Sequence, residues 1–285
     1  MCFGVRDALR KTHAVATAGP VTVLGQLVHN PLVTAHLATL GVREGRLEEV
    51  GRAATAQVVI TAHGAADGDR RAWLEAGHAV TDTTCPLVRK AHAALGRLVE
   101  KGFSPVVIGK KDHVEVRGLT GDFPGAVVVE SAEDLDDLPF SGRLGVVAQT
   151  TQPLERVEKV VEQIRRRRPG SEVRFIDTVC QPTKDRQEAL EVLCRQCEVV
   201  VVVGGANSNN TRELAARASA LGAIAHHVER PEELDPLWFT GVGHVGVTAG
   251  TSTLDETVEA VVARLRLMAA AAAPAPLHGL LRLFA

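Results

Sequence analysis

Three cysteines divide the chain into near-equal thirds, and two of them end the same four-residue phrase. Asp82-Thr83-Thr84-Cys85 is repeated as Asp177-Thr178-Val179-Cys180, while Cys2 stands without such a phrase. The separations of 83 and 95 residues are far longer than those within a zinc finger or a bacterial ferredoxin motif, so only the fold could assemble the three thiols. The pattern predicts three related units that deliver three soft ligands to one metal centre with an open coordination position. Three buried, inert thiols are the alternative interpretation.

Short runs of β-branched residues alternate with amphipathic helical stretches along the whole chain. This alternation is typical of parallel sheets with crossover helices, so the predicted fold class is α/β. We expect three pseudo-repeated parallel-sheet units arranged around a central cavity that contains the cluster. The predicted units span residues 3–85, 86–178 and 179–264, the last with the Cys2 segment, and a low-complexity tail spans 265–285. The predicted buried strands are Val21–Leu24, Val58–Thr61, Pro105–Ile108, Gly145–Val147, Val173–Ile176, Val199–Val203 and Val245–Thr248.

Composition argues against several classes of protein. The formal net charge of −2 provides no basic excess for nucleic acid, and with 3% aromatic residues and no Tyr there is no platform for stacking bases. No apolar run approaches the ~20 residues of a membrane span and no secretion signal precedes Cys2, so we expect a cytoplasmic protein with reduced thiols. The basic run Arg165–Arg168 is interpreted as a solvated helix end. Cys194-Arg195-Gln196-Cys197 is interpreted as two core-facing thiols at a helix C-terminus rather than a redox motif.

Polar residues follow the predicted strands, at the edge where parallel sheets bind their ligands. Three histidines in equivalent loops, together with serine and asparagine side chains, would provide hydrogen-bond donors for a diphosphate. Glu115, two residues beyond one of these histidines, is a candidate proton donor if its pKa is raised, and the alternative is a surface carboxylate paired with Arg117. The candidate diphosphate ligands are His29, His63, His113, Ser208, Asn209, Asn210 and Ser252.

A series of short motifs extends this pattern from residue 2 to about 264. In order, they are Cys2-Phe3-Gly4-Val5, Leu27-Val28-His29-Asn30, Ala62-His63-Gly64, Thr84-Cys85-Pro86-Leu87-Val88, His113-x-Glu115, Gln149-Thr150-Thr151, Asn207-Ser208 and Gly246-Val247-Thr248-Ala249-Gly250-x-Ser252. Each motif alone is weak, but the ordered combination is specific. Together they closely resemble the 4-hydroxy-3-methylbut-2-enyl diphosphate reductase (LytB) family, which provides the last enzyme of the non-mevalonate isoprenoid pathway.

The resemblance implies a cofactor, a reaction and roles for individual residues. It implies an oxygen-sensitive 4Fe-4S cluster held by Cys2, Cys85 and Cys180, whose open iron binds the allylic hydroxyl of the substrate. Reductive removal of that hydroxyl would give isopentenyl and dimethylallyl diphosphate, with electrons from a ferredoxin or flavodoxin. By the same resemblance, Glu115 supplies a proton and Thr150 helps to hold the hydroxyl end and its water. The candidate ligands above hold the diphosphate, and the resemblance itself matches all of them except Asn209.

The chain departs from the family pattern at its N-terminus and at three internal positions. The family has a strand and a Gly-Phe-type turn before its first cysteine, so we expect either a start codon assigned too late or a cluster ligand on a free terminus. Ser208-Asn209 stands where the family has paired serines. The loop Lys110-Lys111-Asp112 replaces small neutral residues, and Leu254 lies where proline is common. A diverged paralogue acting on another small diphosphate, and a non-catalytic metabolite-binding or cluster-sensing protein, remain as alternatives.

Overall fold

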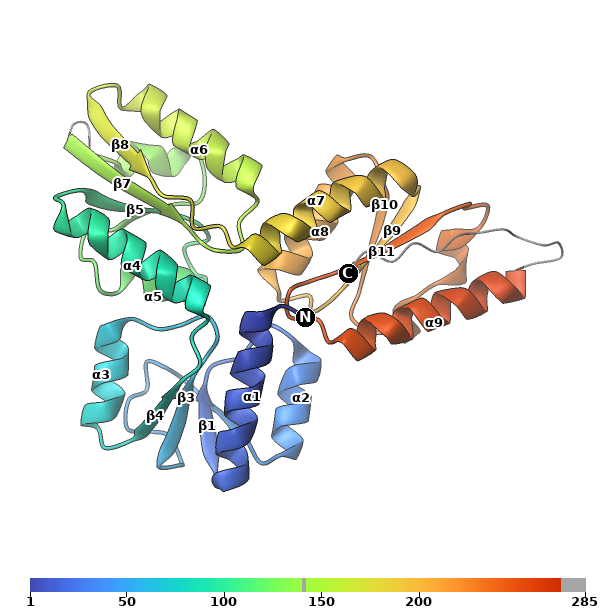
Figure 1. The fold of residues 1–285 in the computed structure, drawn as a ribbon, viewed down its shortest axis with the longest axis horizontal. Coiled ribbons are helices and arrows are strands. Elements are labelled where there is room, and N and C mark those ends of the chain that lie inside the picture. The colour runs from blue at the N-terminus through green and yellow to red at the C-terminus, as the bar shows by residue number, and fades with distance from the viewer. Residues whose placement is uncertain (140–141, 273–285) are drawn as a thin grey trace. The chain divides into compact units, whose positions relative to one another are not determined.

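The described residues form three sheets, and every strand pairing within them is parallel. In the computed structural model, which describes residues 1–139 and 142–272, the strand orders are β2-β1-β3-β4, β6-β5-β7-β8 and β10-β9-β11 (Figure 1). The predicted α/β class with three parallel sheets is therefore confirmed. The strands are β1 Val21–Leu24, β2 Arg43–Gly45, β3 Gln57–Ile60, β4 Ala79–Asp82, β5 Ser104–Ile108, β6 Val127–Val129, β7 Gly142–Ala148, β8 Ser171–Phe175, β9 Val199–Val203, β10 Ile224–Val228 and β11 Val245–Ala249.

Helices connect the strands, and each of the three widely spaced cysteines directly precedes one of them. Cys2 is followed by α1, Cys85 by α4 and Cys180 by α7. The helices are α1 Phe3–Ala18, α2 Pro31–Thr39, α3 Asp67–Glu75, α4 Pro86–Glu100, α5 Val114–Thr120, α6 Leu154–Arg167, α7 Gln181–Gln196, α8 Asn209–Ala220 and α9 Asp255–Ala272. Short 3-10 turns lie at η1 Glu133–Asp137, η2 Pro231–Glu233 and η3 Pro236–Phe239.

The chain divides into two compact units. Unit 1 contains Met1–Cys2, His29–Val33 and the chain from Gln181 onward, and unit 2 contains Phe3–Val28 and Thr34–Cys180. The first two sheets lie in unit 2 and the third lies in unit 1. Each of the three predicted units contains one sheet, and the boundaries between them stay a prediction.

Unit 1 is built around a strand of five valines. All five residues of β9 are fully buried, because helices cover both faces of the sheet. Val201 and Val203 pack against Leu265 and other apolar residues of α9, while Val200 and Val202 pack against apolar side chains of α7 and α8. The predicted tail begins within α9, and its remainder, residues 273–285, lies outside the described residues.

Four strands were not predicted from the sequence, and all four lie at sheet edges. They are β2, β4, β6 and β10, and each contains half-buried or exposed positions. Polar or charged residues interrupt β2, β4 and β10, and β6 is a run of only three valines, so none of the four carries a long apolar run. The seven predicted strands, by contrast, all overlap observed strands: two have the same bounds, and the ends of the others differ by at most three residues.

The basic run at the end of α6 contains one residue that the sequence analysis placed wrongly. Arg168 is only 4% exposed, and its guanidinium donates hydrogen bonds to the carbonyls of Leu135 at 2.7 Å and Leu138 at 2.9 Å, around η1. A buried guanidinium is tolerated because these carbonyls satisfy its donors. Cys194 and Cys197 pack against the core beside α7 and burial raises the pKa of each thiol, which confirms them as core-facing.

Candidate active site

A tight turn follows the third strand of each sheet. The turns at residues 61–64, 149–152 and 250–253 follow β3, β7 and β11, and each is closed by a backbone hydrogen bond of 3.1 Å from its fourth residue to its first. The carbonyl of the second residue of each turn accepts the backbone N–H of a cysteine. These hydrogen bonds join Cys85 to Ala62 at 3.0 Å, Cys180 to Thr150 at 2.9 Å and Cys2 to Thr251 at 2.9 Å. We call the three turns the cysteine seats.

The two Asp-Thr-x-Cys phrases make matching contacts within unit 2. The hydroxyls of Thr83 and Thr178 donate to the carbonyls of Ile60 and Ala148, the last residues of β3 and β7, and both hydrogen bonds measure 2.6 Å. The aspartate of each phrase accepts the backbone N–H two residues later, at 2.9 and 3.0 Å. The repeated phrase is therefore a repeated local structure that ends in a cysteine.

Cys85 combines a helix N-terminus with a close backbone approach. It is the N-cap residue of α4, where the helix dipole favours a thiolate. A Cβ atom added at Gly4 would lie 2.5 Å from the Cys85 sulfur, so only a glycine leaves room for that sulfur. Three half-buried thiols, none in a disulfide among the described residues, are the donor set that iron-sulfur clusters take, and they fit the expected group chemically.

Glu115 lies on the first turn of α5 and is 2% exposed. Its Oε1 accepts the backbone N–H of Thr150 at 2.6 Å. Burial raises the pKa of Glu115 to about 7, although the hydrogen bonds from Thr150 oppose the shift. The alternative pairing with Arg117 is wrong, because Arg117 is paired with Glu48 at 3.4 Å. Glu115 is thus a buried carboxyl group that can hold a proton near neutral pH.

Thr150 connects this carboxyl group to a cysteine. Its N–H is donated to Glu115, and its carbonyl accepts the N–H of Cys180. The predicted catalytic pair and one predicted metal ligand therefore lie together at one cysteine seat in unit 2.

Two of the predicted histidines lie together in unit 2. The rings of His63 and His113 meet edge to face, with their centroids 5.7 Å apart. His113 is the N-cap of α5, and its Nδ1 accepts the N–H of Glu115 at 3.1 Å. A neutral imidazole that accepts at Nδ1 carries its proton on Nε2, which makes that nitrogen a donor. His63 is the third residue of the cysteine seat that holds Cys85.

The third predicted histidine lies in unit 1 with the remaining candidates. The Ser252 hydroxyl donates to the carbonyl of His29 at 3.2 Å, and Asn210 Oδ1 accepts the N–H of Thr251 at 3.0 Å. Burial, aided by the charge of Arg212, lowers the pKa of His29 and favours its neutral form. These contacts place His29, Ser252 and Asn210 at the cysteine seat that holds Cys2.

The N-terminus of α8 contains an amide group that forms no hydrogen bond in the described part of the chain. Ser208 caps the helix by accepting the N–H of Thr211 at 3.4 Å. The next residue, Asn209, is 2% exposed, and both its Nδ2 and its Oδ1 are buried without a partner among the described residues. Buried polar groups normally have partners, and helix N-termini favour anions, so this position fits an anionic ligand.

Asn30 and the backbone of the cysteine seats have structural roles that were not predicted from the sequence. Asn30 accepts the N–H of Leu32 at 2.9 Å and donates to the carbonyl of Ser252 at 2.8 Å, so it ties two candidate loops together. The seats of Cys85 and Cys2 use main-chain atoms of Ala62 and Thr251. Both residues lie two positions after a strand end, and this shared position is the sequence signal that could have identified the seats.

The Lys110-Lys111 loop makes side-chain and backbone contacts within unit 2. The ammonium of Lys111 pairs with Asp134, and the backbone N–H of Lys111 donates to the Glu130 carboxylate at 2.9 Å. The N–H of Lys110 donates to Gln149 Oε1 at 3.2 Å. The loop that precedes His113 is thus held on both sides by its own unit.

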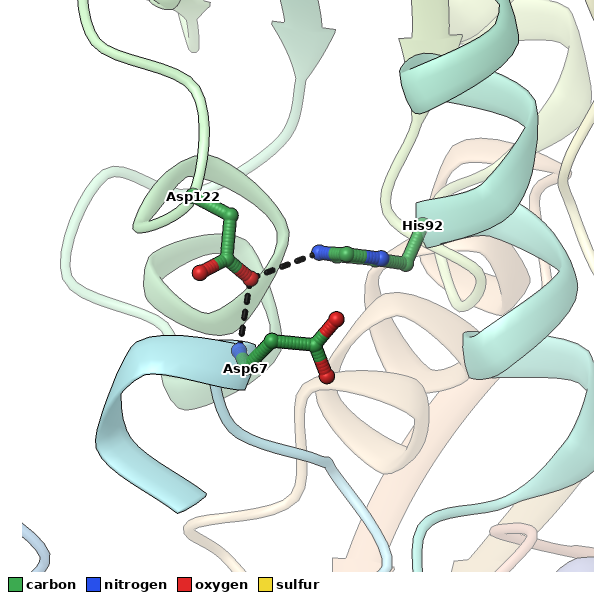
Figure 2. A group of neighbouring side chains, drawn as sticks. All are labelled: Asp67, His92 and Asp122. Atoms are coloured by element: carbon green, nitrogen blue, oxygen red, sulfur yellow. Dashed lines mark hydrogen bonds and ion pairs between the residues drawn. The ribbon is translucent and has the colours of Figure 1, made fainter. Parts of the chain in front are cut away.

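Asp67, His92 and Asp122 form a second group of potential metal ligands in unit 2, shown in Figure 2. Asp122 accepts the backbone N–H of Asp67 at 2.6 Å and that of Gly68 at 3.1 Å, and His92 Nε2 lies 2.9 Å from its Oδ2. These contacts cap the N-terminus of α3, so the group has a structural explanation.

No helix in the described part of the chain is both long and apolar enough to span a membrane.

Comparisons with known proteins agree on one family. Residues 1–266 match the family model described as LytB protein. The 4-hydroxy-3-methylbut-2-enyl diphosphate reductase of Pelobacter propionicus is 38% identical over 93% of this chain and 94% of its own length, and that of Aquifex aeolicus is 37% identical over 93% and 92%.

Solved structures give the same result. The chain resembles the structure of the E-1-hydroxy-2-methyl-but-2-enyl-4-diphosphate reductase from Plasmodium falciparum, with a TM-score of 0.87, 25% identity and coverage of 99% of this chain and 88% of that one. It also resembles a structure of (E)-4-hydroxy-3-methyl-but-2-enyl diphosphate reductase, the terminal enzyme of the non-mevalonate pathway, with a TM-score of 0.68, 36% identity and coverage of 94% and 96%. The chain belongs to the LytB protein family.

Proposed function

We propose that this protein is a reductase that removes the hydroxyl group of 4-hydroxy-3-methylbut-2-enyl diphosphate and releases isopentenyl and dimethylallyl diphosphate. The reaction breaks one C–O bond and forms one C–H bond, and it consumes two electrons and two protons to release water. The relatives that are named for this activity match this chain over nearly their full length. The observation that carries the proposal is the buried Glu115, whose pKa is raised to about 7 and which is joined through Thr150 to the predicted metal ligand Cys180.

The cofactor in this proposal is a 4Fe-4S cluster held by Cys2, Cys85 and Cys180. When bound, it supplies electrons singly and an iron without a protein thiolate, which acts as a Lewis acid toward the hydroxyl oxygen. The support from this chain is the equivalent cysteine seats, the position of each cysteine directly before a helix, and the room that Gly4 leaves beside Cys85. A ferredoxin or flavodoxin is the proposed electron donor.

Glu115 is the proposed proton donor to the leaving hydroxyl. Its raised pKa keeps the proton available at neutral pH, and its contact with Thr150 fixes the orientation of the carboxyl group. Thr150 is proposed to hold the hydroxyl end of the substrate and the water that forms. The Nε2–H of His113 is an additional donor beside Glu115.

The diphosphate is proposed to bind to the histidine, serine and asparagine donors that were predicted from the sequence. Neutral histidine donors and amide donors suit a ligand that brings its own negative charge. The buried amide of Asn209, which has no partner among the described residues, supports an anion at the N-terminus of α8. The proposed ligands are His29, His63, His113, Ser208, Asn209, Asn210 and Ser252.

The test is anaerobic reconstitution with iron and sulfide, followed by turnover of the hydroxymethylbutenyl diphosphate with a chemically reduced dye. We expect about four iron atoms per chain and release of both products. Glu115→Gln is the matched control, because it keeps an oxygen acceptor for Thr150 but cannot donate a carboxyl proton. A chain that binds the substrate and its cluster but never turns over would instead be a non-catalytic sensor.

One observation favours a second candidate, the same dehydroxylation on a different small diphosphate. Asn209 replaces a serine of the family pattern and is bulkier at a fully enclosed position. Asn209→Ser should raise kcat/KM for the hydroxymethylbutenyl substrate if the asparagine has changed the pocket. An unchanged or lower kcat/KM would leave the reductase proposal as it stands and remove the paralogue.

A further inference from the structure

Asn210 and Glu115 occupy matching places in two different sheets. Each is the second residue of its helix, α8 or α5, and each is buried, with 3% and 2% of its surface exposed. A side-chain oxygen of each accepts the backbone N–H of the second residue of a cysteine seat. The hydrogen bond from Thr251 to Asn210 measures 3.0 Å, and that from Thr150 to Glu115 measures 2.6 Å.

The same two seat residues hold the cysteines. The Thr251 carbonyl accepts the N–H of Cys2, and the Thr150 carbonyl accepts the N–H of Cys180, both at 2.9 Å. Each seat residue is therefore fixed through both of its backbone polar groups, one by a cysteine and the other by a buried side chain. A change in that side chain alters the support of the cysteine without touching it.

From this pattern we infer that Asn210 is a positioning residue for Cys2, in addition to its proposed contact with the diphosphate. The inference rests on the proposed function, because it concerns a cluster ligand. Without the Asn210 oxygen, the Thr251 N–H loses its partner in the protein and the seat of Cys2 can move. Partners that orient metal ligands typically change affinity by ~10- to 100-fold, so we expect the cluster to be lost faster by about that factor.

Two substitutions separate the positioning role from diphosphate binding. Asn210→Asp keeps an oxygen acceptor for Thr251 but places a negative charge where the diphosphate is proposed to bind. Asn210→Leu has similar volume and removes every polar atom. We expect Asn210→Asp to retain the cluster and lose affinity for pyrophosphate, and Asn210→Leu to lose both.

The experiment uses the full chain, reconstituted anaerobically, with the loss of cluster absorbance followed under challenge by an iron chelator. Inorganic pyrophosphate, titrated calorimetrically, is the probe of anion binding. Asn209→Leu is the matched control, since Asn209 neighbours Asn210 on α8 but makes no hydrogen bond to a cysteine seat among the described residues. Asn209→Leu should weaken pyrophosphate binding and lose the cluster no faster than the wild type.

A second readout uses the iron-free chain, so it does not depend on a loaded enzyme. In Asn210→Leu, native alkylation by iodoacetamide, resolved by mass spectrometry, should be faster than in the wild type at Cys2 and unchanged at Cys180. Equal acceleration at both cysteines would indicate general unfolding and overturn the inference. Wild-type cluster retention in Asn210→Leu would also overturn it, whereas a wild-type chain that takes up no iron would instead overturn the proposed function.

Discussion

The seats of Cys180 and Cys2 share one backbone geometry but are held by different side chains. In the first, the carboxyl group of Glu115 accepts the seat N–H, and in the second the amide of Asn210 does so. Both oxygens make the same hydrogen bond, yet only the carboxyl group can release a proton. The comparison shows how one repeated arrangement can carry acid chemistry in one unit and remain neutral in another.

Making the two seats alike should have the largest effect on turnover. Glu115→Gln gives the Cys180 seat an amide like that of the Cys2 seat. Loss of a positioned general acid typically lowers the rate by 10²- to 10⁴-fold, so we expect about that loss in kcat with the cluster retained. The measurement is dye-linked turnover at saturating substrate, with iron content determined on the same sample. A variant with wild-type kcat would remove Glu115 from the proton-transfer role.

The same substitution should change how stability depends on pH. The pKa of Glu115 is raised from 4.5 to about 7, so between these values the folded chain keeps a proton that the unfolded chain releases. The contribution of Glu115 to stability should therefore fall as the pH rises from 4.5 to 7 and level off above it.

Relative to Glu115→Gln, the wild-type loss should be about 3 kcal/mol, since one pKa unit corresponds to about 1.4 kcal/mol. Denaturant unfolding in iron-free buffer at several pH values measures the difference. Parallel stability curves for the two chains would contradict the raised pKa.

Cys85 provides a third case, because the backbone of Gly4 lies close to its sulfur atom. Gly4→Ala places a Cβ atom 2.5 Å from that sulfur, so either the thiol or α1 must move. We expect the cluster to be retained ~10- to 100-fold less well, an effect of the size that misplaced metal ligands produce. Chelator challenge measures the loss, and Gly19→Ala, which meets no atom within 4 Å, is the control for alanine at another glycine.

The smallest predicted effect compares the threonines of the two Asp-Thr-x-Cys phrases. The hydroxyl of Thr83 donates to one strand-end carbonyl, whereas that of Thr178 donates to the Ala148 carbonyl and also accepts the Ala148 N–H at 2.9 Å. Thr178→Val should therefore destabilise the chain more than Thr83→Val, by about 1 kcal/mol for the additional hydrogen bond. Thermal or denaturant unfolding of both variants makes the comparison, and a larger cost at Thr83 would contradict it.

Much of this arrangement could be predicted from the sequence because its signals are local. The run Val199–Val203 predicts a buried strand wherever it occurs, and the repeated phrase before Cys85 and Cys180 predicts related turns. Four of the six edge strands were not predicted. Residues such as Arg43–Gly45 are largely exposed, and their pairing is decided by the neighbouring strand.

The cysteine seats and Arg168 were missed for different physical reasons. Ala62 and Thr251 contribute backbone atoms, and a backbone hydrogen bond leaves no trace in residue type. Arg168 ends a run of four arginines, and only the turn at η1, distant in sequence, provides the carbonyls that allow it to be buried. In both cases the deciding partner comes from another segment of the chain.

The use of main-chain carbonyls in the cysteine seats has a consequence for how much the side chains at these positions can vary. A substitution at position 62, 150 or 251 leaves the carbonyl that accepts the cysteine N–H in place. The side chains at these positions can therefore change independently of the anchor, and alanine at one and threonine at the other two already differ. Three units built on the same backbone anchor can therefore carry different side-chain chemistry at one position without losing the contact that holds the cysteine.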